Sequence, residues 1–187
     1  QAAVNVTGLN ESVVREVIRL AGDRKAWLIF CAGVDHAEAI CDLLIDGGIP
    51  SACVTGATPA KERARILDDY KTGKLRALTN ANVLTTGFDY PDIDLIAMLR
   101  PTLSPGLYVQ MAGRGLRIKS HVDHCLVLDF AGNVERHGPI TAVEPPTKKK
   151  GEGLPPTKAC PECSEIVSAN ATICTSCGHV FPPQEKE

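Results

Sequence analysis

The sequence contains no run of about 18 apolar residues, the minimum for a membrane-spanning helix, so no membrane partner is expected. Aromatic residues are few, with one Trp, three Tyr and four Phe, which argues against base stacking as the main means of binding a nucleic acid. The formal net charge of −2 supplies no long-range attraction for an anionic partner, which would need a local basic surface. Hydrophobic residues make up 44% of the 187 residues, enough for one globular domain and a small appendage.

Two phosphate-binding signatures are also missing. The sequence has no G-x-x-x-x-G-K-[S/T] loop, and no Asp-Glu pair ends a predicted strand. It therefore lacks the motifs that bind the β- and γ-phosphates of a nucleotide and its Mg²⁺. The chain starts at Gln1 without the layout of a signal peptide, which suggests a fragment of a longer protein. Single cysteines in apolar segments indicate reduced thiols and a cytoplasmic protein; they are Cys31, Cys41, Cys53 and Cys125.

Short apolar runs alternate with amphipathic segments over the first 130 residues. The periodicity predicts helices over 10–22, 34–45, 59–70 and 104–116, with Asn10 or Ser12 capping the first. The apolar runs predict strands over 27–31, 51–55, 75–79, 94–99 and 124–129. This alternation predicts an α/β fold with a parallel sheet and helices on both faces, whose functional groups gather beyond the carboxyl ends of the strands.

The pattern changes after residue 130. Residues 141–158 contain four prolines, two glycines and a run of three lysines, a composition typical of an exposed linker. We therefore expect a globular domain over residues 1–140, a linker over 141–158, a small module over 159–182 and a tail over 183–187.

Four cysteines in the small module form two C-x-x-C pairs. Cys160, Cys163, Cys174 and Cys177 have the spacing C-x2-C-x10-C-x2-C, which brings four thiolates to one tetrahedral ion. Two disulfides are the alternative, disfavoured by the reduced character of the other cysteines. The spacing predicts a structural Zn²⁺ in a zinc ribbon. His179 is expected to be incidental, and His121 with His124 lack a third ligand for another metal.

The stretch Tyr108–Arg117 contains a glutamine and two arginines. Arg114 and Arg117 are three residues apart, so on a helix they share one face and converge on one anion, with Gly113 and Gly115 keeping that surface bare. An arbitrary R-x-x-R is more often a pair of solvated side chains.

A second polar stretch follows the third predicted strand. Thr85, Thr86 and Gly87 offer hydroxyls and an open backbone amide to phosphate oxygens, and Asp89 could accept hydrogen bonds from a sugar or orient Arg114. Taken alone, a polar turn with Asp89 as a cap explains the stretch equally well.

The two stretches together resemble the fifth and sixth motifs of superfamily 2 helicases, with T-x-G-x-D about 25 residues before Q-x-x-G-R-x-x-R. Residues 27–38 resemble the fourth motif, and Val54–Thr58 with Glu62 and Arg63 the block after it. The resemblance covers roughly Ser12 to Phe130, and with the four cysteines it is strongest to bacterial RadD-type repair helicases and related phage proteins. It implies the second RecA-like domain of a DNA helicase or translocase.

The resemblance also implies residue roles at a nucleotide. Arg114 and Arg117 match arginine fingers that reach the γ-phosphate of ATP, and Gln110 matches the residue that senses the nucleotide. Gly87 and Asp89 match the nucleotide-facing part of the fifth motif. ATP and Mg²⁺ would be held by a first RecA-like domain that this sequence lacks, so the chain alone is expected to be inactive.

For the nucleic acid, the resemblance implies contacts to the phosphate backbone. Thr55, Gly56 and Thr85 or Thr86 match these positions, so sequence specificity should be low and a DNA single strand or fork is the expected partner of a monomer. Two alternatives remain open: the motor subunit of a restriction system, and a non-catalytic nucleic-acid-binding or docking module that works through the zinc ribbon.

Overall fold

The computed structural model describes residues 6–84, 88–143, 157–164, 166–168 and 171–182. The chain divides into two compact units, residues 1–146 and 147–187, which are described separately. Among the described residues, no helix is long and apolar enough to cross a membrane.

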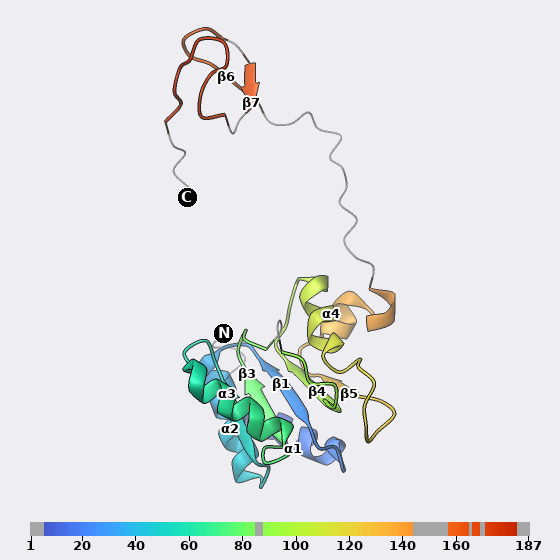
Figure 1. Cartoon of the computed structure of the whole chain (residues 1–187). Helices are drawn as coiled ribbons and strands as arrows, with labels where there is room; N and C mark the ends of the chain where they lie inside the picture. The colour runs from blue at the N-terminus through green and yellow to red at the C-terminus, as the bar shows by residue number, and fades with distance from the viewer. Residues whose placement is uncertain (1–5, 85–87, 144–156, 165, 169–170, 183–187) are drawn as a thin grey trace. The chain divides into compact units, whose positions relative to one another are not determined.

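The first unit is a five-stranded parallel sheet in the order β2-β3-β1-β4-β5 (Figure 1). Its strands are β1 (Trp27–Cys31), β2 (Ser51–Val54), β3 (Ala77–Asn80), β4 (Leu95–Leu99) and β5 (Leu126–Asp129). Its helices are α1 (Thr7–Ala21), α2 (Val34–Asp46), α3 (Ala60–Lys71), α4 (Pro105–Gly113) and α5 (Asn133–His137), followed by the 3₁₀ turn η1 (Ile140–Ala142). All five strands predicted from the sequence are confirmed.

Helices cover both faces of the sheet because successive side chains of each buried strand point to opposite sides. On one face, Trp27 and Ile29 of β1 pack in a core with side chains of α1 and α2. On the other face, Leu28 and Phe30 pack in a core with side chains of α3 and α4. This two-sided burial is the parallel sheet with helices on both faces that the alternating pattern predicts, and it gathers the loops after the strands at one edge.

Two helix ends differ from the sequence-based prediction. Helix α1 begins at Thr7 rather than near Asn10, and Asn10 lies inside the helix with 3% of its surface exposed. Ser12 does not cap the helix, because its hydroxyl donates to the Gly8 carbonyl at 2.9 Å within it. At the other end of the unit, α4 stops at Gly113, so the predicted helix over 104–116 is too long by three residues at its C-terminus.

The second unit is built around two short antiparallel strands, β6 (Thr157–Ala159) and β7 (Ile166–Ser168), and a bridge between Ile173 and Val180. Its small core contains Cys160, Val167 and Cys174. With so little apolar area to bury, a unit of this size ordinarily needs a metal or disulfides for stability.

Candidate nucleotide and nucleic-acid interface

The loop between β2 and α3 is held in a fixed shape by its own side chains. The Thr55 amide donates to the Thr58 hydroxyl at 2.9 Å, and the Ala57 amide donates to the Thr55 hydroxyl at 3.3 Å. Thr55 is buried, so its hydroxyl shapes the loop, whereas Gly56 is exposed with open space around it. Of the two residues predicted to contact a nucleic acid here, Gly56 offers its backbone and Thr55 supports it.

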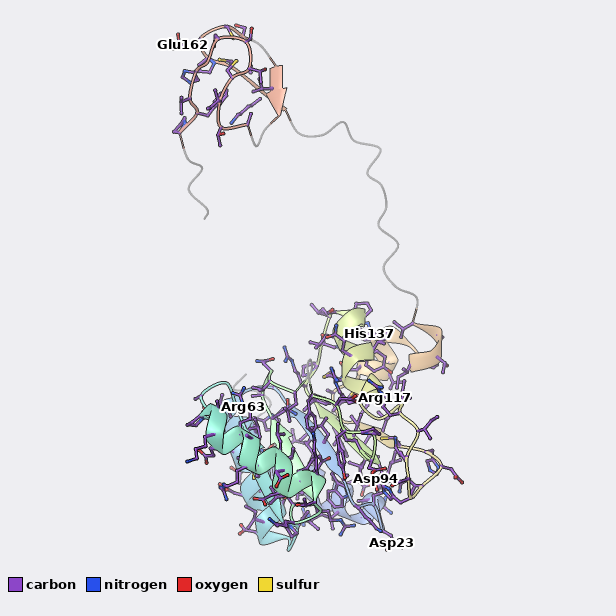
Figure 2. All side chains as sticks on the ribbon, in the orientation of Figure 1. Asp23, Arg63, Asp94, Arg117, His137 and Glu162 are labelled. Carbon is purple, nitrogen blue, oxygen red and sulfur yellow. The ribbon has the colours of Figure 1, made fainter. Side chains whose placement is uncertain are left out.

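Arg63 on α3 stabilises the same loop. Its Nη2 donates to the Thr55 carbonyl at 3.1 Å and to the Thr58 carbonyl at 3.2 Å. A second guanidinium nitrogen, Nε, is buried without a hydrogen-bond partner among the described residues. Figure 2 labels Arg63 at the first turn of α3. The two hydrogen bonds from Nη2 join α3 to both ends of the loop, so Arg63 helps to fix its shape.

The turn from β1 to α2 is shaped by a buried histidine. The Ala32 amide donates to Nδ1 of His36 at 3.3 Å, and His36 is 4% exposed. Burial lowers the pKa of His36, which favours the neutral imidazole that can accept this hydrogen bond. Gly33 precedes α2 without a side-chain cap. The first amides of α2 therefore receive no side-chain acceptor from their own cap residue.

The loops after β3 and β4 contact each other over the end of β1. Asn80 is fully buried, and its Nδ2 donates to the Ile29 carbonyl at 3.0 Å. Asn82 adopts a left-handed backbone conformation with φ of 62°, and its Oδ1 accepts a hydrogen bond from Nη1 of Arg100. The next residues predicted to bind phosphate, Thr85, Thr86 and Gly87, lie outside the described residues.

The two arginines do not share a helical face, and this part of the prediction is wrong. Arg114 is the C-cap residue of α4, and the chain beyond it forms tight turns in which the Gly115 amide donates to the Ala112 carbonyl at 2.9 Å. The reason is close packing, since a Cβ on Gly115 would lie 2.4 Å from Sγ of Cys125. Gly115 is therefore buried and does not bare a surface for an anion, whereas Gly113 has open space around it.

Each arginine instead contacts the segment that begins at Phe88. Nη1 of Arg114 donates to the Phe88 carbonyl at 2.5 Å, and Nη2 of Arg117 lies 3.4 Å from Oδ1 of Asp89. Asp89 thus pairs with Arg117, whereas the sequence suggested that it would orient Arg114. Both side chains of this pair are more than half exposed, 56% for Arg117 and 61% for Asp89. Arg117 is thus the more exposed of the two arginines. Gln110, the third residue predicted to act at the nucleotide, is an exposed residue on α4.

The four cysteines of the second unit converge on one point. Their Sγ atoms all lie within 4.8 Å of one another, and the Cys160–Cys177 and Cys163–Cys174 pairs are each 3.6 Å apart. Four sulfurs at about 2.3 Å from a tetrahedral zinc ion lie about 3.8 Å from one another, so the cluster has the dimensions of a zinc site. The thiols are not joined as disulfides. His179 lies outside this cluster, with its ring edge against Phe181.

The backbones of the two C-x-x-C turns make the same hydrogen bond. The Ser164 amide donates to the Cys160 carbonyl at 2.8 Å, and the Gly178 amide donates to the Cys174 carbonyl at 2.9 Å. Ser164 and Gly178 are both left-handed, with φ of 58° and 77°. Such turns direct the amides that follow the first cysteine of each pair toward its sulfur.

The thiols of this cluster differ in acidity. Hydrogen bonds from the Cys177 and Ser176 amides hold the pKa of the Cys174 thiol down at about 7. The His179 amide also donates to the Cys177 thiol, but the neighbouring thiols of Cys163 and Cys160 raise the pKa of Cys177 to about 12. A cluster of thiols cannot lose every proton without a cation to balance the charge, which is what a bound divalent metal supplies.

A sequence model of the helicase conserved C-terminal domain matches residues 10–119, more than half of the chain. The chain belongs to this family. Its helicase C-terminal domain is of the superfamily 2 DEAD/DEAH type, and relatives in the family are ATP-dependent helicases.

Two relatives match much of the sequence. A 51.5 kDa protein of a Lactococcus phage is 30% identical over 182 residues, which cover 93% of this chain and 40% of the phage protein. The putative ATP-dependent helicase IRC3 of Saccharomyces cerevisiae is 35% identical over 131 residues, 69% of this chain and 19% of the yeast protein. The chain thus spans two fifths or less of the length of these relatives.

Solved structures agree on the fold of the helicase C-terminal domain. The C-terminal domain of the DEAD-box protein Dbp5 superposes with a TM-score of 0.56 at 23% identity, over 65% of this chain and 69% of that one. A fragment of a putative HsdR subunit of a type I restriction enzyme from Vibrio vulnificus superposes with a TM-score of 0.61 at 20% identity, over 73% and 29%. At these identities the likeness establishes the fold alone.

Sequence reasoning missed several residues that shape this helicase domain. Asn133 is fully buried at the start of α5, where its side chain accepts from the Thr102 amide at 2.9 Å and donates to the Arg100 carbonyl at 3.0 Å. It thereby fixes the loop that leads into α4. His121 contacts two aspartates and His124 contacts Nη2 of Arg24 at 3.1 Å. The only available signal was a polar residue next to an apolar strand, which does not identify its partner.

Proposed function

We propose that this chain is the C-terminal motor domain of an ATP-dependent DNA helicase or translocase. In the longer protein, a first RecA-like domain would hold ATP and Mg²⁺, and this domain would complete the active site. The observation that carries the proposal is the contact between Arg117 and Asp89, which brings the sixth and fifth motifs together at an exposed position.

The two arginines would act differently at the nucleotide. Arg117, which is more than half exposed and held by one aspartate, is free to turn toward a γ-phosphate presented by the opposite domain. A guanidinium at that place stabilises the charge that develops in phosphoryl transfer, worth about 10³–10⁵ in rate in comparable enzymes. Arg114 donates to the Phe88 carbonyl and is less exposed. It would hold the two motifs together and reach the nucleotide from a fixed position.

The remaining nucleotide contacts are proposed from the motif resemblance. Asp89 would accept hydrogen bonds from the ribose once Arg117 has left it, and Gly87, which lies outside the described residues, is proposed to offer its amide. Gln110, exposed on α4, would link the state of the nucleotide to the nucleic-acid side of the domain. Closing of the two domains on ATP, and reopening after hydrolysis, would drive the steps along the strand.

The nucleic acid would bind along the loops at the carboxyl edge of the sheet. Gly56 offers an exposed amide on a loop that Arg63 holds in shape, and the amides at the start of α2 lie at the same edge. Thr85 and Thr86 are proposed to add hydroxyl contacts to phosphates. Because these groups address the backbone, binding should be insensitive to base sequence. DNA is proposed because the RadD-type repair helicases are the family that the motifs and the cysteines resemble.

The four-cysteine cluster would hold one structural Zn²⁺. Four sulfurs at zinc-site distances leave no position for water, so the metal would stabilise the fold of the second unit without reacting. Cys160, Cys163, Cys174 and Cys177 would be its ligands.

The test is ATP hydrolysis by the full-length protein, with and without single-stranded DNA or RNA. Stimulation by DNA above RNA is expected. Arg117→Ala should remove the stimulated turnover while ATP binding persists, and Arg19→Ala should change neither, because Arg19 is an exposed arginine of α1 paired with Glu16. Unchanged turnover in Arg117→Ala would refute the finger assignment, and stimulation by RNA alone would refute the choice of DNA.

A further inference from the structure

Two segments lie against each other from the end of α4 onward, Phe88–Asp94 and Arg114–His121. Beyond the two arginine contacts, Nζ of Lys119 lies 3.5 Å from the Pro91 carbonyl. The Ser120 amide and hydroxyl donate to Oδ1 of Asp92 at 2.8 and 2.9 Å. His121 then contacts Asp94. Successive residues of one segment contact successive residues of the other, so the two segments run parallel in a single register.

His121 makes the last and most buried of these contacts. Its Nε2 lies 2.8 Å from Oδ2 of Asp94, and its Nδ1 lies 3.6 Å from Oδ1 of Asp92. The Asp94 side chain has no exposed surface, and it also accepts from the Lys25 and Ala26 amides at 2.7 and 2.9 Å. A buried carboxylate that loses one of its partners is costly, so His121 is confined to this position.

The turn that carries Arg117 is held mainly by its own residues, since Nζ of Lys119 donates to the Gly115 carbonyl at 2.6 Å and to the Arg117 carbonyl at 2.9 Å. The neighbours of Arg117, Leu116 and Ile118, are 62% and 95% exposed, so neither is packed into the core. On the helix side the turn packs at Gly115, whose added Cβ would meet Cys125 and Ile96. The backbone that carries Arg117 is therefore joined to the rest of the domain at Gly115 on one side and through Ser120 and His121 on the other.

We propose that His121 is a positioning residue for Arg117. Its contacts to the buried Asp94 and to Asp92 hold the end of the Arg114–His121 segment in place. This limits the positions that the Arg117 side chain can reach when its guanidinium leaves Asp89. The inference rests on the proposed function, in which Arg117 reaches a phosphate. Its effect belongs in the rate of the chemical step, because a displacement of about 1 Å at a charged catalytic group can cost up to about 10² in rate.

The experiment compares His121→Ala with His124→Ala in the full-length protein. His124 is an exposed histidine three residues along whose ring contacts Arg24. His121→Ala should lower kcat for DNA-stimulated ATP hydrolysis by about ten- to a hundredfold and leave KM for ATP within about threefold. His124→Ala should leave both unchanged. His121→Gln, which keeps one of the two hydrogen bonds, should lie between wild type and His121→Ala.

Added imidazole separates positioning from a general loss of folding. A cleft of about 230 Å³ borders His121 and opens to solvent between Lys25, Lys71 and Ser120. Imidazole bound there would pair with Asp94 but is not attached to the chain, so it should raise the stability of His121→Ala and leave kcat low. Recovery of kcat with imidazole would overturn the proposal, because the link between residue 121 and Asp94 would then be dispensable.

The outcomes distinguish this inference from the proposed function. If wild type is active, Arg117→Ala is inactive and His121→Ala matches wild type, the positioning role is refuted and the proposed function stands. If wild type shows no stimulated turnover, the proposed function fails. Amide hydrogen exchange over residues 116–121 then tests the segment by itself, and exchange as slow in His121→Ala as in His124→Ala would refute the inference.

Discussion

Arg117 and Asp89 face each other across the fifth and sixth motifs, with Nη2 and Oδ1 3.4 Å apart and both side chains more than half exposed. An ion pair open to water contributes little to stability, typically less than about 1 kcal/mol. A nucleotide that offers Arg117 a phosphate and Asp89 a ribose can therefore separate them at small cost. The pair is suited to be a resting contact that ligand binding replaces.

The first prediction follows from this weak pairing. Arg117→Ala should change the free energy of unfolding by less than about 1 kcal/mol, even though it abolishes stimulated turnover. Urea unfolding of the mutant and wild type measures the first quantity directly. A loss of several kcal/mol would show that Arg117 is part of the fold, and the loss of activity could then not be assigned to a missing finger.

The second prediction concerns Gly115, whose missing side chain is needed for packing. A Cβ at this position would lie 2.4 Å from Sγ and 3.0 Å from Cβ of Cys125, and 3.0 Å from Cδ1 of Ile96. Gly115→Ala should destabilise the domain by about 1–3 kcal/mol. Gly113→Ala is the matched control, because nothing lies within 4 Å of its Cβ position.

The same contact predicts a suppressor. Adding Cys125→Ala to Gly115→Ala removes the sulfur that the new methyl group meets, so the double mutant should regain part of the lost stability. Thermal or urea unfolding of the four proteins in this cycle measures the coupling. Additive effects of the two substitutions would contradict the packing explanation.

The third prediction is a pH dependence due to His36. Burial lowers the pKa of His36 in the folded protein below its ordinary value of 6.5, so the unfolded chain takes up a proton more readily than the folded one. The stability associated with the neutral ring is therefore present above about pH 6.5 and is lost as the pH falls below it, by at most about 1.4 kcal/mol per pH unit.

His36→Asn tests this prediction, because asparagine keeps an acceptor for the Ala32 amide and does not titrate. The difference in unfolding free energy between wild type and mutant should be constant above pH 6.5 and should shift in favour of the mutant below it. A difference that stays constant from pH 7.5 to pH 5 would show that His36 has an ordinary pKa in the folded domain.

The strands were predictable from the sequence because each is a short apolar run, such as Trp27–Cys31, all of whose residues are buried. The end of α4 was not predictable, because Gln-Met-Ala-Gly-Arg-Gly-Leu-Arg continues a helical pattern. What ends the helix near Gly113 is the packing of Gly115 against Cys125, ten residues along the chain. Helix propensity depends on the local sequence and therefore cannot reveal a packing contact of this kind.

In the candidate site, too, the motif residues were predictable from the sequence and the residues that support them were not. The motif resemblance predicted that Arg117 and Asp89 belong to one nucleotide site but not that they touch each other, and in the structure they are 3.4 Å apart. The residues that support such contacts, His121 and Arg63, have partners 27 and 8 positions away, which no spacing rule indicates. Thr85, Thr86 and Gly87 remain predictions, since they lie outside the described residues.

The fourth prediction is that metal removal unfolds the second unit alone. Each chain should bind one Zn²⁺, measurable by elemental analysis, and a chelator should abolish the structure around Cys160 and Cys174 while the melting temperature of the sheet unit persists. Cys163→Ser should lose the metal, and Cys53→Ser on β2 should retain it. Zinc bound equally well by Cys163→Ser would refute the four-cysteine assignment.

The fifth prediction separates shape from charge at the β2–α3 loop. Arg63 donates to the Thr55 and Thr58 carbonyls, so its role is to hold the loop that presents Gly56. Arg63→Ala should weaken binding of single-stranded DNA by the full-length protein severalfold. Because Arg63 is engaged with the loop and not with phosphate, the slope of log K against log salt should stay at its wild-type value, whereas losing a phosphate contact lowers it by about 1.

Arg65→Ala is the matched control for this experiment, since Arg65 lies on the same helix with a side chain that is 70% exposed. It removes the same charge two residues away without touching the loop carbonyls. If Arg63→Ala and Arg65→Ala weakened DNA binding equally, the effect would be one of net charge. A lower salt slope for Arg63→Ala alone would mean that the guanidinium leaves the loop to bind a phosphate, and the loop would then need another support in the bound state.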